Sequence, residues 1–344
     1  MVKLRLTKGS KVYVVAPAGV VTGGPEDLYQ IAENLRGLFP HIQVYMYYID
    51  RPGMDNPVAE PYAHFGIERA MDIEDSENNV LILPEKYTTK LGELTHIQKV
   101  VWWLSLDNYY FSPSISNRKR WFNSMMLRRF GSQHFMFMDK AQLKTILWHM
   151  TQSYRAHLHL MRKGIPHVYH MADHVVPEFA NYKINESIKE DIVVYNSKQG
   201  LAFTQKLIAT SPDITFISIS PTDRRLSDED QRALLARAKV YIDFGHHPGG
   251  QRLPKEAALH GCCVITNKKG SANCFDDVPI PPDFKFNQNF FIRPLAMYRI
   301  RQKIKECFND YHSQVRRFRA FRERARTDYQ QHLDDIRYLF VYEE

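Results

Sequence analysis

The sequence has few cysteines, and their spacing suits neither a metal site nor a disulfide scaffold. Only four occur in 344 residues, namely Cys262, Cys263, Cys274 and Cys307. Cys262 and Cys263 are adjacent in the apolar run CCVIT, where a buried thiol behaves as a small hydrophobe. We therefore expect a protein of a reducing compartment and no disulfide framework.

Long apolar segments are also missing. No stretch reaches the ~18 uninterrupted apolar residues of a membrane-spanning helix, and the segment MVKLRLTKGSKVYVV has no signal-peptide core. These absences predict a cytoplasmic protein, with attachment to the inner face of a membrane left open. The composition, 44% hydrophobic and 24% charged, is that of a globular chain with enough material for two cores.

Acidic residues (38) are fewer than lysines and arginines (46), so the formal net charge is +8. This excess suits phosphorylated small molecules, nucleic acid or an anionic membrane surface as partners, and it also suits general solubilising charge. No nucleic-acid-binding motif is present, so nucleic acid is not an expected partner. The arginine-rich segment after residue 295 has apolar residues at Val315, Phe318, Phe321 and Ala325. It is either a helix that packs across both domains or a basic amphipathic helix on an anionic membrane.

Two tandem sets of alternating strands and helices fill most of the chain. In the first set we expect strands at 11–17, 42–49, 79–85 and 99–106, and helices at 25–39, 88–98 and roughly 140–163. A short strand falls within 166–179, and the apolar pattern lapses at 181–191. The second set has strands at 192–196, 214–220, 239–245 and 262–266, with helices at 199–211, 228–238 and 254–261.

Strands that alternate with helices of this length are joined by crossovers and lie parallel. We therefore predict an α/β fold of two Rossmann-like, doubly wound domains facing a cleft. The expected domains are residues 1–183 and 184–300, followed by a basic helical extension at 301–344.

Three loops after strands are candidate ligand sites, because doubly wound folds bind ligands at the carboxyl ends of their strands. In the first, AGVVTGGPEDLYQ, Gly23 and Gly24 let the backbone approach a ligand closely. Glu26 and Asp27 follow in the first helical turn, where the helix dipole favours acids in any case. The glycine spacing is not the dinucleotide fingerprint. The loop is either a generic glycine turn or the lining of an acceptor or donor-phosphate site.

The second loop, YNSKQG, places Asn196, Lys198 and Gly200 at a helix start. An ammonium and free backbone N–H groups together make an anion site. The third loop lies in YIDFGHHPGGQRLPKEAALHGCCVIT. Its candidate donor-binding residues are Asp243, His247, Gly249, Arg252, Lys255 and Glu256.

The charges of the third loop match a nucleoside diphosphate. Arg252 immediately precedes a helix expected to begin near Pro254, so the guanidinium and the helix amides could share a diphosphate, with Lys255 adding charge. Glu256, in the first turn, could accept hydrogen bonds from ribose or sugar hydroxyls, or be an ordinary N-terminal acid. Adjacent histidines rarely converge on one ion, so we expect no metal here.

The second and third loops, YNSKQG and VYIDFGHHPGGQRLPKEAALHGCCVIT, resemble the donor-binding half of bacterial GT-B-fold glycosyltransferases of the surface-polysaccharide type. A group of these holds a nucleotide sugar on a DFG-x-HPG-x-x-R-x-P-(R/K)-EA loop. The pieces GGPEDLYQIAENL, WWLSLDNYY and QSYRAHLHLMRKGIPHVYHMADHVVPEF resemble the acceptor-side domain of the same group. The likeness covers roughly residues 11–270 and is strongest at 241–265. Two departures, Lys255 where arginine is more usual and Gln251 where an acid often stands, leave the donor unspecified.

The resemblance implies a glycosyltransferase that moves a sugar from a nucleoside-diphosphate sugar to a glycan or lipid-linked acceptor, in polysaccharide biosynthesis. Lys198 and Arg252 would neutralise the diphosphate, and Glu256 would bind the ribose or donor sugar. The resemblance implies no cofactor beyond this co-substrate and no essential metal, with leaving-group charge stabilised electrostatically. Alternatives are a nucleotide-sugar epimerase or hydrolase of the same fold, or a basic nucleic-acid-binding protein.

An inverting enzyme would also need a base on the first domain. Asp107, after the strand KVVWWLSL, is the first candidate, with Glu26 and Asp27 next. Asp107 could equally be a turn residue, and the sequence does not decide between inversion and retention. The histidines at 157, 159, 167, 170 and 174 are expected to be ordinary polar or core residues.

Overall fold

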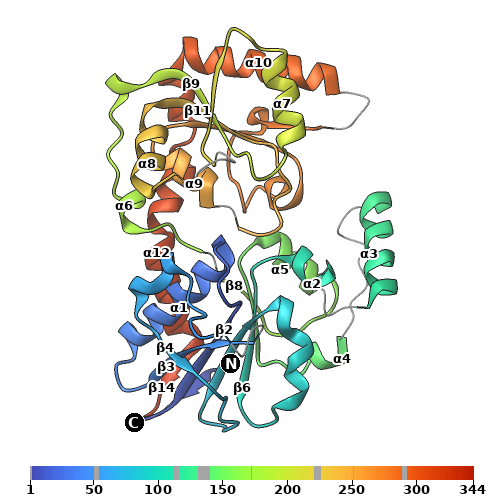
Figure 1. Ribbon diagram of the computed structural model, residues 1–344, viewed down its shortest axis with the longest axis vertical. Helices are drawn as coiled ribbons and strands as arrows, with labels where there is room; N and C mark the ends of the chain where they lie inside the picture. The colour runs from blue at the N-terminus through green and yellow to red at the C-terminus, as the bar shows by residue number, and fades with distance from the viewer. Residues whose placement is uncertain are drawn as a thin grey trace. The chain divides into compact units, whose positions relative to one another are not determined.

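A computed structural model describes most of the chain. The described residues are 2–49, 54–111, 116–130, 140–171, 173–220, 226–250, 252–288 and 293–344. They form two compact units, the first made of Met1–Asp173 with Gln330–Glu344 and the second of His174–Tyr329. Figure 1 shows the elements of each unit.

The first unit contains a parallel sheet of seven strands in the order β4-β3-β2-β5-β6-β7-β8. The strands are β2 (Lys11–Ala16), β3 (Gln43–Tyr48), β4 (Glu68–Ala70), β5 (Val80–Pro84), β6 (Gln98–Trp103), β7 (Trp148–Thr151) and β8 (Val168–His170). All five residues of β5 are buried, as expected of a parallel strand covered on both faces. The strand order reverses between β2 and β5, so ligand-binding loops are expected there.

Successive residues of β2 supply two separate cores, because neighbouring side chains of a strand point to opposite faces. Val12 and Val14 belong to one core, and Tyr13 and Val15 belong to the other. The surrounding helices and 3-10 turns are α1 (Gly23–Leu38), η1 (Glu60–Phe65), η2 (Glu85–Glu93), α2 (Leu106–Phe111), α3 (Asn117–Phe130), α4 (Lys140–Leu143) and α5 (Tyr154–Arg162). The buried face of α1 contains Leu28, Ile31, Ala32 and Leu35, which are spaced three or four residues apart as on one side of a helix.

Two sequence predictions for this unit are wrong. The helix expected over 140–163 is interrupted by β7, because this segment pairs with β6 on one side and β8 on the other. Those pairings lie far from the segment in sequence, so local periodicity could not show them. The helix expected at 88–98 is instead the 3-10 segment η2, which ends at Glu93.

The second unit contains a parallel five-stranded sheet in the order β10-β9-β11-β12-β13. Its strands are β9 (Glu190–Tyr195), β10 (Thr215–Ser218), β11 (Ala238–Asp243), β12 (Cys263–Asn267) and β13 (Lys285–Phe286). Its helices are α6 (Pro177–Ala180), α7 (Leu201–Ala209), α8 (Asp228–Arg237), α9 (Arg252–Leu259), α10 (Arg293–Asn309) and α11 (Tyr311–Arg316). Each unit is thus a parallel α/β structure, as the alternation of strands and helices predicted.

The C-terminal segment supplies core residues to each of the two units and is not a separate extension. Helix α12 (Arg319–Leu339) contributes Phe321 and Ala325 to the core of the second unit. Its later residues Ile336 and Leu339 enter a core of the first unit. Strand β14 (Phe340–Tyr342) then pairs in parallel with β1 (Leu4–Leu6). The apolar residues considered for membrane contact are therefore core residues.

The boundary between the two units lies at 173/174, ten residues before the predicted boundary at 183/184. The difference arises because Val175 and Phe179 pack in the core of the second unit. Among the described residues, no helix is both long enough and apolar enough to cross a membrane.

Candidate active site

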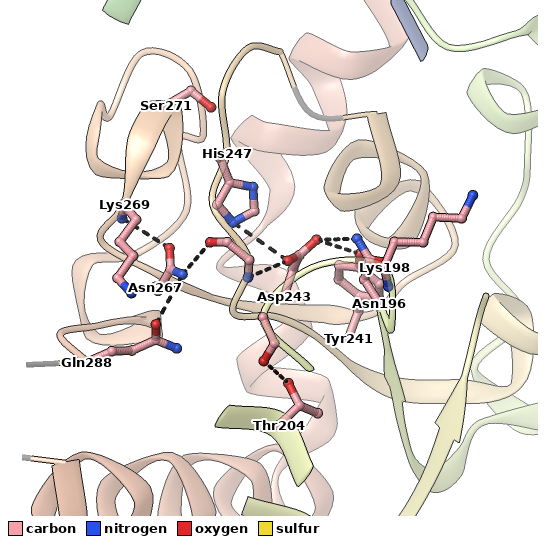
Figure 2. Close-up of polar contacts among 12 residues, drawn as sticks. Asn196, Lys198, Thr204, Tyr241, Asp243, His247, Asn267, Lys269, Ser271 and Gln288 are labelled. Carbon is pink, nitrogen blue, oxygen red and sulfur yellow. Dashed lines mark hydrogen bonds and ion pairs between the residues drawn. The ribbon is translucent and has the colours of Figure 1, made fainter. Parts of the chain in front are cut away.

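Asp243, the last residue of β11, organises the carboxyl edge of the second sheet (Figure 2). Its side chain is almost completely buried and accepts three hydrogen bonds. Asn196 Nδ2 and the Tyr241 hydroxyl each donate to Oδ2 at 3.1 Å, and the Gly245 N–H donates to Oδ1 at 2.9 Å. Asp243 therefore holds the loops after β9 and β11 together, which is a structural role next to the predicted donor site.

The same two loops touch through glycine backbone. Gly200 has φ of +70° and caps α7, and a Cβ on it would overlap the Phe244 carbonyl and lie 2.6 Å from the Gly245 nitrogen. A Cβ on Gly245 would lie 2.5 Å from the Gln199 Cβ. Only glycine allows this approach. The structure thus brings YNSKQG and DFGHHPG together, as the sequence analysis predicted for a shared ligand.

His247 is a buried histidine in this loop. It has no exposed surface, and within the described part of the chain neither ring nitrogen makes a hydrogen bond. Its Nε2 lies 3.7 Å from Asp243 Oδ1. The backbone around it is braced by the loop after β12, since Ser271 donates from its N–H to the His247 carbonyl (2.8 Å) and from its hydroxyl to the Gly249 carbonyl (2.6 Å). Burial without hydrogen bonds makes His247 a candidate for contact with a bound ligand.

Helix α9 begins at Arg252 itself, two residues before the predicted start. Glu256 consequently lies in the second turn and not the first; it is 7% exposed. Lys255 Nζ donates to Asp328 Oδ2 on α12 at 2.6 Å, and both side chains are buried. This ion pair accounts for the charge of Lys255 without a diphosphate, so its placement does not support the predicted donor-binding role. The ligand roles of Arg252 and Glu256 stay predictions.

In the first unit, the glycine loop after β2 leads directly into α1, which begins at Gly23. A Cβ on Gly24 would make only an ordinary contact, 3.5 Å from Leu104 Cδ1, so close packing does not require glycine there. Asp27 is buried and accepts a hydrogen bond from Gln152 Nε2 at 2.8 Å, which links this loop to the one after β7. Glu26 is half-buried in the first turn of α1.

Asp107, the first candidate for the base, is held by Arg155. It lies in α2 just after β6, and the guanidinium donates to both carboxylate oxygens at 2.9 and 3.1 Å. The two side chains are each 10% exposed. A bidentate, charge-assisted pair stabilises the anion, so proton uptake by Asp107 would require Arg155 to release one oxygen.

Glu85, a buried carboxyl at the same sheet edge, was not among the predicted site residues. Glu85 directly follows β5, and its Oε2 accepts a hydrogen bond from the Leu104 N–H at 2.9 Å. Burial raises the pKa of Glu85 from 4.5 to about 7. The available signal was an acid immediately after the apolar run NVLILP. No local signal identified Arg155 or Asp328, which lie 48 and 73 residues from the groups they bind.

His159 is a core histidine, as predicted. It hydrogen-bonds the Tyr110 hydroxyl at 2.8 Å, and burial lowers its pKa to about 3. His149, which accepts from Trp103 Nε1, has its pKa lowered by burial to about 4. Across the described ranges no three His, Cys, Asp or Glu side chains are grouped as a metal site requires. The expectation that no metal is needed stays a prediction.

Comparison with known proteins finds a likeness in structure and none in sequence. No family model and no curated protein matches the chain. Sucrose-phosphate synthase from Thermosynechococcus elongatus is 13% identical with a TM-score of 0.65, over 96% of this chain and 98% of that one. HepE from Anabaena, in complex with UDP and glucose, is 12% identical with a TM-score of 0.58, over 96% and 100%.

A third similar structure is an α,α-trehalose-phosphate synthase (UDP-forming) from Burkholderia vietnamiensis. It is 10% identical with a TM-score of 0.54, over 96% of this chain and 98% of that one. The chain has the GT-B fold. The predicted fold class is thereby confirmed, and at these identities the likeness extends to the fold alone.

Proposed function

We propose that the protein is a glycosyltransferase that transfers a sugar from a nucleoside-diphosphate sugar to a glycan or lipid-linked acceptor. The observation that carries the proposal is the backbone contact between Gly200 and Gly245. It joins the loop of Lys198 to the loop that leads into α9 and Arg252. The names of the similar structures support a uridine nucleotide as the first donor to test, since HepE was crystallised with UDP and with UDP-glucose.

The proposed chemistry is electrostatic. Breaking the sugar–phosphate bond leaves an oxocarbenium-like sugar and a diphosphate whose negative charge must be stabilised. Lys198, Arg252 and the first amides of α9 would supply that stabilisation without a metal or other cofactor. Arginine suits this role because its guanidinium can bind two phosphate oxygens at once. Glu256 would accept hydrogen bonds from ribose or sugar hydroxyls.

The base of an inverting reaction would come from the first unit. Of the three acids predicted for it, Asp107 is bound by Arg155, and Asp27 is buried and bound by Gln152. Glu26, half-buried at the start of α1, is the most exposed of the three. Since a base must reach the acceptor hydroxyl, exposure favours Glu26.

The test is transfer activity with a panel of nucleotide sugars, chosen first by thermal shift, because a ligand that binds only the native state raises the unfolding temperature. Arg252→Ala should lower kcat for transfer by roughly 100-fold and leave the fold intact. The control is Arg299→Ala, which removes an exposed arginine on α10. Wild-type turnover in Arg252→Ala would contradict the site, and donor turnover that needs no acceptor would indicate a hydrolase or epimerase.

Peripheral contact with an anionic membrane is part of this proposal, and α3 is the element that supports it (Figure 1). Trp121 and Met125, one helical turn apart, are 66% and 40% exposed. Arg118 and Lys119 are exposed on the same helix, and residues 116–130 contain no acid. Exposed apolar side chains beside basic ones suit an interface of anionic lipid.

A further inference from the structure

A pocket of about 180 Å³ opens in the second unit, and the described residues that line it come from three segments. Ala202, Phe203 and Lys206 lie on α7, Lys269 follows β12, and Gln288 follows β13. The residues described as lining it do not include those proposed above to hold a nucleotide sugar. What it could bind is decided by the polar atoms of its lining.

A chain of hydrogen bonds fixes the amide of Gln288 (Figure 2). The Lys269 N–H donates to Asn267 Oδ1 at 3.0 Å, which sets the orientation of the Asn267 amide. Asn267 Nδ2 therefore points the other way and donates to the Gly245 carbonyl at 2.5 Å and to Gln288 Oε1 at 3.4 Å. Gln288 Oε1 is thus used as an acceptor, and Nε2 is the group of that amide left without a hydrogen bond.

Gln288 Nε2 is a buried donor without an acceptor. The residue is 7% exposed, and no atom of the described chain accepts a hydrogen bond from Nε2. Leaving such a donor unsatisfied costs stability, and native structures usually satisfy it with protein, water or ligand. Because Gln288 lines the pocket, an occupant of the pocket is the candidate source of that acceptor.

Among the described residues that line the pocket, the other polar side chains are two lysines. Lys206 and Lys269 are both exposed, so together with Gln288 Nε2 they offer donors from three separate segments. Three N–H donor groups with two positive charges suit a phosphate, which has three acceptor oxygens, better than a carboxylate, which has two. Phe203 adds an apolar surface and is held by an edge-on contact with Phe244, with ring centroids 5.0 Å apart.

We propose that this pocket binds the phosphate group of a small phosphorylated metabolite, with the carbon skeleton of the ligand against Phe203. The proposal does not depend on the transferase activity. Asn267 donates to both Gln288 and Gly245, so an occupant of the pocket lies one side chain away from the loop that carries His247.

The test is calorimetric titration of the full chain with inorganic phosphate, glucose 6-phosphate and glucose. Glucose 6-phosphate should bind more tightly than phosphate, and glucose should not bind. Gln288→Glu keeps an oxygen that accepts from Asn267 but replaces the donor with a negative charge, so it should weaken glucose 6-phosphate binding by about tenfold or more. Gln288→Met removes the donor without adding a charge and should weaken binding less. The matched control, Lys183→Ala, removes an exposed lysine of the same unit and should leave the Kd unchanged.

Unfolding temperatures without ligand show whether each variant is folded. Unchanged affinity in both folded Gln288 variants, or no binding by the wild type, overturns the proposal. Arg252→Ala separates this pocket from the proposed donor site: it should leave glucose 6-phosphate binding intact. Loss of binding in that variant would place the phosphate on the α9 loop and overturn a separate site, whatever the transfer assay shows. Equal affinities for phosphate and glucose 6-phosphate would overturn the role of Phe203.

Discussion

Replacing Glu85 by glutamine should stabilise the first unit at pH 8 and change it little at pH 5. The carboxyl of Glu85 is buried, and desolvation raises its pKa from 4.5 to about 7. Between these values the unfolded chain releases the proton while the folded chain keeps it. The free energy of unfolding therefore falls as the pH rises from 4.5 towards 7. A glutamine has no charge to desolvate and keeps an oxygen for the Leu104 N–H.

The magnitude follows from the pKa change. Each pKa unit corresponds to about 1.4 kcal/mol, so the rise from 4.5 to about 7 costs the folded state about 3 kcal/mol above pH 7. By the same relation the cost at pH 5 is less than about 1 kcal/mol. Burial lowers the pKa values of His149 and His159, which has the opposite effect on the pH dependence. Both histidines are present in wild type and variant, so they cancel in the difference.

Urea denaturation followed by tryptophan fluorescence measures this difference, because all four tryptophans lie in the first unit. Glu85→Gln should gain up to about 3 kcal/mol over wild type at pH 8, with the gain shrinking as the pH falls. The control is Glu33→Gln, which replaces an acid on the exposed face of α1 and should show no such gain at pH 8. Parallel stability curves for wild type and Glu85→Gln across pH 5–8 would refute the reasoning.

Three further predictions concern packing and surface contacts. Gly200→Ala should destabilise the second unit by about 2–4 kcal/mol. Gly164→Ala, also at a positive φ but with open space around the added Cβ, should cost only about 1 kcal/mol. Calorimetry compares the two variants, and equal costs would refute the close contact at Gly200. Asp328→Asn removes the charge that neutralises a buried ammonium and should cost about 3–5 kcal/mol in the same experiment; a cost under 1 kcal/mol would contradict the buried ion pair. Trp121→Ser should reduce co-sedimentation with phosphatidylglycerol vesicles several-fold, with Phe275→Ser, also exposed, as control; equal losses would argue against α3.

The alternation of strands and helices could be predicted because parallel strands covered on both faces leave uninterrupted apolar runs. β5 is such a run, and β12, which ends in Thr266 and Asn267, is likewise buried at every residue. The prediction failed at 140–163, where Leu143 and Trp148 belong to different elements. There the backbone is extended because β7 forms hydrogen bonds with β6 and β8. Those partners are distant in sequence, so local periodicity could not predict the strand.

The loops of the candidate site could be predicted for a related reason. Gly200 and Gly245 are glycines because two backbones touch, and glycines after strands are visible in a sequence. The ion-pair partners of the charged side chains could not be predicted. Lys255 resembles a ligand-binding lysine until α12 brings Asp328 to it from 73 residues away. Asp107 resembles a free base until α5 supplies Arg155.

The pairing of β14 with β1 has a consequence for synthesis. Leu4 pairs with Phe340, and Ile336 and Leu339 fill the core beside them. The ribosome makes these residues only after the whole of His174–Tyr329. Domains usually fold in order from the N-terminus during translation, but here the second unit is complete in sequence before the first. A chain that ended at Tyr329 would contain the whole second unit, whereas its first unit would have an unpaired β1 and an open core, which is a surface for chaperones to cover.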